Sequence, residues 1–267
     1  NLKLTPLAYH SRMTDHPPPA REGARRPGRQ LGLRSLPSVE LRLLLPIAII
    51  LAGLTLFAQI AQSATLAEPN RFDTALLLLF RNPQDLGDPR GPVWFEEMVR
   101  DFTAFGSTGP LLFLTGAATG YFLLRRNYHM AGLVLLTVFG GFALTLLLKE
   151  GFDRPRPVLV PRGTYVNTQS FPSGHSSIAA ALYLTVGVLV ARLQRGRRLR
   201  VYVLAVALLL TFLVGLSRVY LGVHYPSDVL GGWTIGAVWA TIVLVASRWW
   251  RAASRNRPEI RDGPQEP

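Results

Sequence analysis

Residues 172–191 read PSGHSSIAAALYLTVGVLVA, a polar turn that runs directly into an apolar stretch. Ser173 is a residue type that caps helix N-termini, and Gly174 lets the backbone N–H groups of a first helical turn approach an anion closely. The apolar run near Ser176–Ala191 is long enough to be a membrane-crossing helix. The stretch therefore predicts a transmembrane helix whose N-terminus is an anion site, with His175 beside that anion.

Five further apolar segments of similar length lie along the chain. A hydrocarbon core of about 30 Å needs about 20 helical residues, and the sequence predicts a membrane protein on that basis. The expected fold class is all-α, with six transmembrane helices near Leu43–Gln62, Ser107–Leu124, Met130–Leu148, Ser176–Ala191, Tyr202–Leu216 and Val229–Trp249.

Two glycine pairs and one long connection add detail to the predicted six-helix arrangement. Gly116/Gly120 and Gly232/Gly236 have the spacing that permits close helix contact, although glycine is also common in membrane helices. Between the first two spans, residues 63–106 contain the short apolar run Phe72–Phe80 and an amphipathic stretch around Trp94–Glu97. Both are predicted to be helices at the membrane interface, serving either as an approach for lipid or as a tether.

The charge pattern favours a membrane over nucleic acid. The chain has 29 Lys and Arg against 16 Asp and Glu, a formal net charge of +13, and no cysteine. Its arginines form short blocks between apolar runs, as in loops beside anionic lipid, and not a folded patch for nucleic acid. These blocks share one side of a six-span arrangement, so the positive-inside rule predicts cytoplasmic termini. Without cysteine, neither a disulfide nor a Cys-based metal site is possible.

Two more polar segments stand at the ends of predicted spans. Lys149 is expected in the last turn of the third span, because prolines after Arg154 and Arg156 stop the helix and extend the chain. Arg218 and His224 flank a short loop before the sixth span. Asp228 follows four residues later, where it can hold one imidazole nitrogen and leave the other free to attack phosphorus. These cations, imidazoles and carboxylate suit a doubly charged phosphate.

Together the three segments read K-x6-RP, PSGH and SR-x5-H-x3-D, a pattern that resembles the type 2 phosphatidic acid phosphatase family. The resemblance covers roughly residues 40–250. Its fixed positions are Lys149, Arg156, Pro157, Pro172, Ser173, Gly174, His175, Ser217, Arg218, His224 and Asp228.

The resemblance implies roles for these residues. Phosphate would be bound by Lys149, Arg156, Ser173, Gly174 and Arg218. His224 would attack to form a phosphohistidine that Asp228 orients, and His175 would protonate the leaving group. No metal and no cofactor would be needed, because the cations stabilise the transferred group.

The expected function is a multi-pass phosphatase of a bacterial inner membrane, acting on lipid phosphates or diphosphates at the extracytoplasmic side. Undecaprenyl diphosphate, phosphatidylglycerol phosphate and phosphatidic acid all suit the site. A lipid phosphotransferase of the same fold or a non-hydrolytic lipid transporter are the alternatives. Residues 1–40 are expected to be a basic, Pro-rich, disordered cytoplasmic tail, 41–250 the six-helix phosphatase domain, and 251–267 a polar cytoplasmic tail. The oligomeric state stays open.

Overall fold

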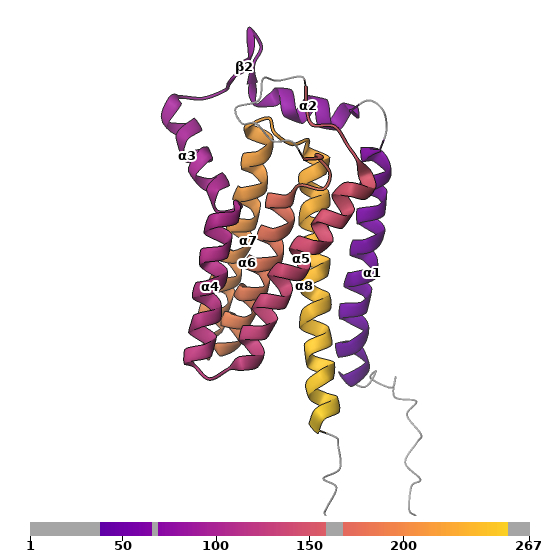
Figure 1. Cartoon of the computed structure of the whole chain (residues 1–267), viewed down its shortest axis with the longest axis vertical. Coiled ribbons are helices and arrows are strands. Elements are labelled where there is room, and N and C mark those ends of the chain that lie inside the picture. Colours follow the sequence, from indigo (N-terminus) through magenta and orange to yellow (C-terminus); the bar gives the residue numbers. More distant parts are fainter. Residues whose placement is uncertain (1–37, 66–68, 159–167, 256–267) are drawn as a thin grey trace, which may run out of the picture.

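A computed structural model describes residues 38–65, 69–158 and 168–255. These residues form a bundle of long helices with a smaller cap over one end (Figure 1). The bundle consists of α1 (Ser38–Ala64), α4 (Thr108–Leu124), α5 (Tyr128–Phe152), α6 (Gly174–Leu193), α7 (Arg197–Tyr220) and α8 (Pro226–Arg255). Of the predicted tails, 1–37 and 256–267 lie outside the described residues, and the remainder continue α1 and α8.

Each predicted span overlaps one helix of the bundle. Five helices in the described part of the chain are long and apolar enough to cross a membrane. The sixth, α4, is apolar but has only 17 residues, which at 1.5 Å per residue gives about 25 Å. The predicted all-α membrane fold is therefore confirmed, whereas the count of six spans is reached only if this shorter helix is included.

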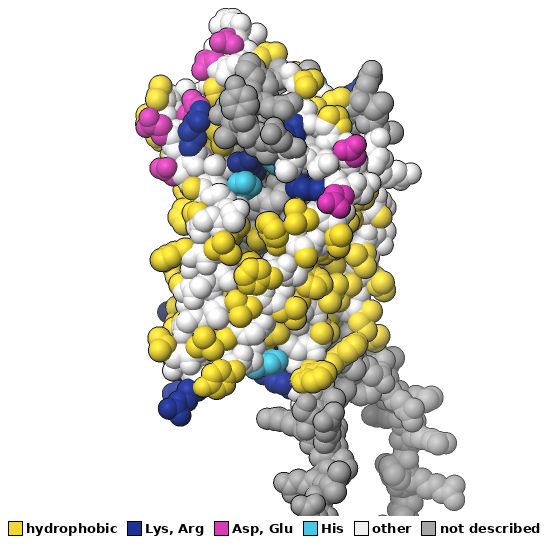
Figure 2. Space-filling model, in the orientation of Figure 1, with side chains coloured by type: hydrophobic (Ala, Val, Ile, Leu, Met, Phe, Trp, Pro, Cys, Tyr) yellow, Lys and Arg dark blue, Asp and Glu magenta, His cyan; other side chains and the backbone are white. Residues whose placement is uncertain are grey.

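The outer surface of the bundle is apolar. Figure 2 shows hydrophobic side chains over the sides of the bundle, with charged side chains gathered toward its ends. Phe113 and Leu147 expose 75% and 67% of their surface. An apolar surface this extensive is unfavourable in water and favourable in lipid. The bundle is therefore a membrane-embedded body.

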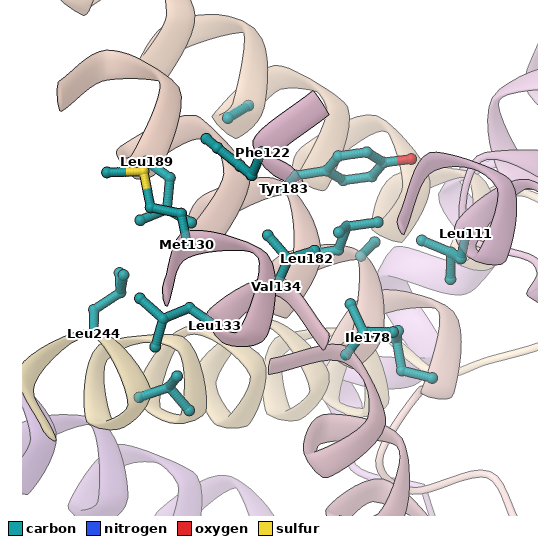
Figure 3. Packing of buried hydrophobic residues seen from close by; sticks show 14 of the residues in the cluster. Leu111, Phe122, Met130, Leu133, Val134, Ile178, Leu182, Tyr183, Leu189 and Leu244 are labelled. Carbon is teal, nitrogen blue, oxygen red and sulfur yellow. The ribbon is translucent and has the colours of Figure 1, made fainter. Parts of the chain in front are cut away.

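The helix α6 is the centre of the bundle and packs against α5, α7 and α8. Its small residues Ala179, Ala180 and Ala181 are fully buried and let the neighbouring helices approach closely. Below them Leu182 packs in one apolar cluster with Val134 of α5 (Figure 3). Such burial on all sides fixes the position of the helix, and with it the polar turn at its N-terminus.

The two glycine pairs differ in what they contact. A methyl group at Gly232 would lie 2.8 Å from the carbonyl oxygen of Ser173, and one at Gly236 would lie 2.3 Å from that of Ser177. These glycines allow α8 to touch the backbone of α6. At Gly116 and Gly120 a methyl group would meet nothing within 4 Å. The close-contact interpretation therefore holds for the second pair and is wrong for the first within this chain.

The cap is formed by the segment between α1 and α4. It contains α2 (Arg71–Leu79), a hairpin of β1 (Arg81–Asn82) and β2 (Asp85–Pro89), and α3 (Val93–Ala104). Both expected helices are present, but the hairpin was not predicted. The cap is also docked on the bundle, since α2 contacts α8 and α3 contacts α7. Its Asp73 and Leu77 are completely buried, so α2 is part of the packed structure.

Three helix ends bring the polar motifs to the capped end of the bundle. The helix α5 ends at Phe152, with Asp153 in a left-handed conformation at its C-cap. Ser173 caps α6, and its Oγ accepts from the backbone N–H of Ser176. The helix α8 begins at Pro226, which leaves His224 in the preceding loop. The first and last described helices have their free ends at the opposite end of the bundle (Figure 1).

Candidate active site

The three polar motifs meet beneath the cap. Figure 2 shows a histidine and basic side chains together at this level, immediately above the hydrophobic belt. The side chains of Lys149, Arg156, Arg218 and His224 are all buried. The titratable side chains around His175 are those of Arg218, His224, Arg156 and Lys149, so the sequence-predicted set converges on one site.

His224 lies between a cation and a carboxylate. Its Nε2 is 3.2 Å from Nη1 of Arg156, and its Nδ1 is 3.4 Å from Oδ2 of Asp228. A guanidinium can only donate, so Nε2 presents its lone pair on the cationic side and Nδ1 carries the proton toward Asp228. Burial, together with the charges of Arg218 and Arg156, outweighs Asp228 and lowers the pKa of His224 to about 3. The imidazole is therefore neutral near pH 7, the form that a nucleophile needs.

Asp228 is held on both carboxylate oxygens. Oδ2 accepts from the hydroxyl of Ser170 and from the backbone N–H of Tyr225 at 2.9 Å. Oδ1 accepts from Nη1 of Arg154 at 2.5 Å. Its backbone carbonyl also accepts from the N–H of Ser173 at 3.0 Å. The carboxylate thus has a single orientation, and its own backbone is tied to the first turn of α6.

The cations are oriented by backbone and hydroxyl groups. Arg156 lies in the extended segment after α5 and donates to the carbonyl oxygens of Thr168 (2.8 Å) and Val223 (2.9 Å). Lys149 donates from the last turn of α5 to the carbonyl of Gln169. Arg218 donates to Oγ1 of Thr103 at 2.8 Å, and its buried Nε has no protein partner among the described residues. These bonds fix three positive charges around one space.

The N-terminus of α6 completes that space. A methyl group at Gly174 would stand 3.7 Å from Cε of Lys149, so the lysine lies against the glycine. The Oγ of Ser173 accepts from the N–H and hydroxyl of Ser176. Those contacts use its oxygen as an acceptor and leave its own proton for another group. Helix-terminal N–H groups and fixed cations together form an anion site.

An apolar cavity of about 330 Å³ opens beside this anion site. Gly174 and His175 form its polar end. Its lining also includes Leu112 of α4 and Phe139 of α5, residues that are 47% and 56% exposed on the outer surface of the bundle. The cavity is therefore shared between the candidate anion site and residues of the surface that faces lipid.

Sequence reasoning missed one part of the site. Arg154 does not point at the anion space with Arg156, because it is enclosed by Asp73 of α2, Ser227 and Asp228. Burial alone would lower the pKa of Arg154, but Asp228 and Asp73 more than offset it, and the pKa is raised. A proline follows both Arg154 and Arg156, so this pattern does not distinguish the two arginines. Nothing in the sequence links Asp73 to Arg154, which lies 81 positions away.

The comparisons with known proteins all point to the same family. The PAP2 superfamily profile matches residues 130–252. Phosphatidylglycerophosphatase B of Bacillus subtilis (strain 168) is 35% identical over 196 residues, covering 72% of this chain and 89% of the relative. Lipid A 1-phosphatase of Rhizobium johnstonii is 31% identical over 194 residues, covering 63% and 74%. The crystal structure of a transmembrane PAP2-type phosphatidylglycerolphosphate phosphatase from Bacillus subtilis matches with a TM-score of 0.61 and 31% identity, covering 76% of this chain and 96% of that one.

Proposed function

This chain belongs to the PAP2 superfamily, and from that premise we propose that it is an integral-membrane phosphatase of lipid phosphates that works through a phosphohistidine on His224. The observation that carries the proposal is the orientation of this imidazole. Its Nε2 faces the cations and its Nδ1 faces Asp228, which is the arrangement required for attack on a bound phosphate. The two relatives are phosphatases of lipids by name, and the similar crystal structure is of a transmembrane phosphatase, which supports the same reaction class.

Phosphate binding falls to Lys149, Arg156 and Arg218, with the N–H groups at the start of α6 and the hydroxyl of Ser173. A phosphate dianion placed among three fixed cations gains charge-assisted hydrogen bonds in a site that excludes bulk water. The same groups stabilise the negative charge on the equatorial oxygens in the transition state. We propose on this ground that hydrolysis needs no divalent metal.

The first chemical step transfers the phosphoryl group to the protein. The lone pair of His224 Nε2 forms the N–P bond, while the P–O bond to the lipid breaks and its electrons stay on the lipid oxygen. Protonated His175 gives that oxygen its proton, since the negative phosphate offsets the charge of an imidazolium beside Arg218. Asp228 stabilises the positive charge that develops on His224.

The second step returns the enzyme to its starting state. A water molecule attacks phosphorus opposite the N–P bond, and His175, now neutral, accepts its proton. The N–P bond breaks with its electron pair returning to Nε2, and inorganic phosphate leaves. The proton that His175 donates to the lipid alcohol is thereby replaced by one from water, and no other co-substrate is consumed.

Preference for a lipid follows from the cavity beside His175. Its apolar lining from α4, α5 and α6 suits the hydrocarbon next to the phosphate, and its outer end lies on the lipid-facing surface. A phosphorylated lipid can therefore present its head group to the cations while its tail stays in the bilayer. Phosphatidylglycerol phosphate is our first candidate, with undecaprenyl diphosphate and phosphatidic acid as the alternatives in the same chemical class.

The experiment that tests the function is phosphate release by detergent-purified protein. Phosphatidylglycerol phosphate, phosphatidic acid and undecaprenyl diphosphate are each supplied in mixed micelles with excess EDTA, beside a His224→Ala control. Release by the native protein and none by the variant is the expected result. Loss of lipid phosphate without free phosphate would indicate transfer to another lipid, and no turnover of any substrate would favour a transporter.

We also propose that the site faces the extracytoplasmic side. The basic turns at Arg125–Arg126 and 195–200 lie at the end of the bundle opposite the site, which the positive-inside rule places in the cytoplasm. A reporter fused after Pro267 should then be cytoplasmic, and one inserted near Arg162 extracytoplasmic. The reverse pattern would refute this orientation.

A further inference from the structure

Asp73 is a buried carboxylate far from every motif in the sequence, yet it contacts the start of α8. It is completely buried. Its Oδ1 accepts from the backbone N–H of Ser227 at 2.8 Å. Its Oδ2 accepts from the hydroxyl of Ser227 at 2.6 Å and from Nη2 of Arg154 at 2.8 Å. Through Asp73, the cap helix α2 thus contacts Ser227, the residue immediately before the catalytic carboxylate of Asp228.

Arg154 links this carboxylate to Asp228. Its Nη1 donates to Oδ1 of Asp228 at 2.5 Å and to Oγ of Ser227 at 2.8 Å. Its guanidinium carbon also lies 4.5 Å from the centre of the Tyr225 ring, a cation–π contact. With 5% of its side chain exposed, the guanidinium is confined between the two acids.

The charge balance of this group matters for His224. Two carboxylates and one guanidinium leave one net negative charge at Asp228, next to an imidazole that becomes positive during attack. If Arg154 had Asp228 as its only acid, the pair would be neutral, and the guanidinium would draw the carboxylate away from Nδ1. Asp73 supplies the second acid and holds the other edge of the guanidinium.

We propose that Asp73 and Arg154 are positioning residues for phosphoryl transfer, with Asp73 holding and offsetting Arg154 so that Asp228 keeps its orientation and its net charge toward His224. This inference rests on the proposed function. It also gives the cap a role in the chemistry, because α2 carries the acid that completes the group. Neither residue touches the phosphate-binding space, so substrate binding is not expected to depend on them.

The size of the effect follows from the charge that is removed. A unit charge about 10 Å from the imidazole, at an effective dielectric constant of about 20, changes a charge-forming step by about twentyfold in rate. Asp73→Asn keeps the shape and an acceptor for the Ser227 N–H while it removes that charge. We expect kcat to fall by about twentyfold, with KM within about twofold of the native value.

A purely structural role for Asp73 would consist of anchoring the cap to the bundle. The matched control is Tyr220→Phe, because the Tyr220 hydroxyl donates to the carbonyl of Arg90 at 3.0 Å and ties the same cap to α7 without touching Asp228. We expect this variant to keep kcat within twofold. A loss equal to that of Asp73→Asn would assign the effect to anchoring and overturn the proposal.

The deciding variant is Asp73→Asn combined with Arg154→Gln. This pair removes one negative and one positive charge and restores the net charge of Asp228 toward His224. We expect kcat within about fivefold of the native enzyme and above that of Asp73→Asn alone. Under anchoring alone, the double variant loses more contacts and is no faster than the single one.

All variants are compared per folded molecule, using phosphate release together with size exclusion and thermal unfolding in detergent. Native protein and His224→Ala are run in parallel, so failure of the proposed function appears as an inactive native protein and is separate from this test. If Asp73→Asn does not fold, the double variant decides: retained turnover supports the inference, and a folded but inactive protein overturns it. A change of KM alone, or an unchanged kcat in Asp73→Asn, would also overturn it.

Discussion

Gly236→Ala should damage both stability and turnover, although it adds only one methyl group. That group would lie 2.3 Å from the carbonyl oxygen of Ser177 and 2.9 Å from Cβ of Ala180. An ordinary contact needs about 3.4 Å or more, so α6 and α8 must separate by about 1 Å. Overpacking of this kind costs about 1–3 kcal/mol, against which the helix propensity of alanine returns less than about 1 kcal/mol.

The same separation reaches the site, because the first turn of α6 carries His175 and the first turn of α8 carries Asp228. Their backbones are joined by the N–H of Ser173 and the carbonyl of Asp228. A displacement of about 1 Å in reacting groups costs up to about 10²-fold in rate. We therefore expect a lower unfolding temperature in detergent and a kcat reduced by between about tenfold and a hundredfold.

Gly116→Ala is the matched control for this prediction. It makes the same chemical change in a glycine pair of the same spacing, but its methyl group would meet nothing within 4 Å. Unfolding temperature and phosphate release are measured for both variants beside the native protein. If Gly236→Ala were as stable and as active as Gly116→Ala, the close approach of α6 and α8 would not be what positions the site.

Three further predictions use the same assays. His175→Ala should slow hydrolysis of a lipid phosphate by about 10²–10⁴ and p-nitrophenyl phosphate much less, because the latter leaving group needs little protonation; equal losses would remove the acid role. The pKa of His224 is depressed to about 3, below its unfolded value, so the unfolded chain binds more protons and stability should fall as pH drops from about 6.5 toward 3. Thermal unfolding of His224→Asn should show a weaker dependence on pH, and an unchanged slope would contradict the assignment. Leu112→Trp should raise KM for a long-chain lipid phosphate and leave KM for p-nitrophenyl phosphate unaffected. Leu124→Trp, on the open surface of α4, should change neither KM. Equal effects of the two variants would show that the cavity does not bind the lipid.

The positions of the long helices could be predicted from the sequence because lipid imposes a simple rule on composition. Every predicted span overlaps one observed helix, and Ser173 caps α6 as its residue type predicts. These features are local, so hydropathy and capping chemistry are sufficient to find them. The C-terminal end of α7 extends beyond the predicted limit because its polar residues Ser217 and Arg218 are buried in protein.

The supporting network of the site could not be predicted in this way. Ser170 and Asp73 contact Asp228 and Arg154 across 58 and 81 residues, and neither has a spacing that marks it. The hairpin of β1 and β2 was also missed, since its residues show no alternation of apolar and polar positions. Motif residues are recognisable by their type and spacing, whereas the groups that orient them are fixed only by the three-dimensional fold.

If the proposed phosphohistidine mechanism holds, the cavity beside His175 sets the order in which the two products depart. In-line displacement requires water to approach phosphorus from the side that the lipid alcohol has just left. That side is the polar end of an apolar cavity whose outer end lies on the lipid-facing surface. The alcohol must therefore slide back into the bilayer before the phosphohistidine can be hydrolysed. Under this mechanism the sideways exit of a hydrocarbon chain precedes hydrolysis, and the fluidity of the surrounding lipid would enter the rate of turnover.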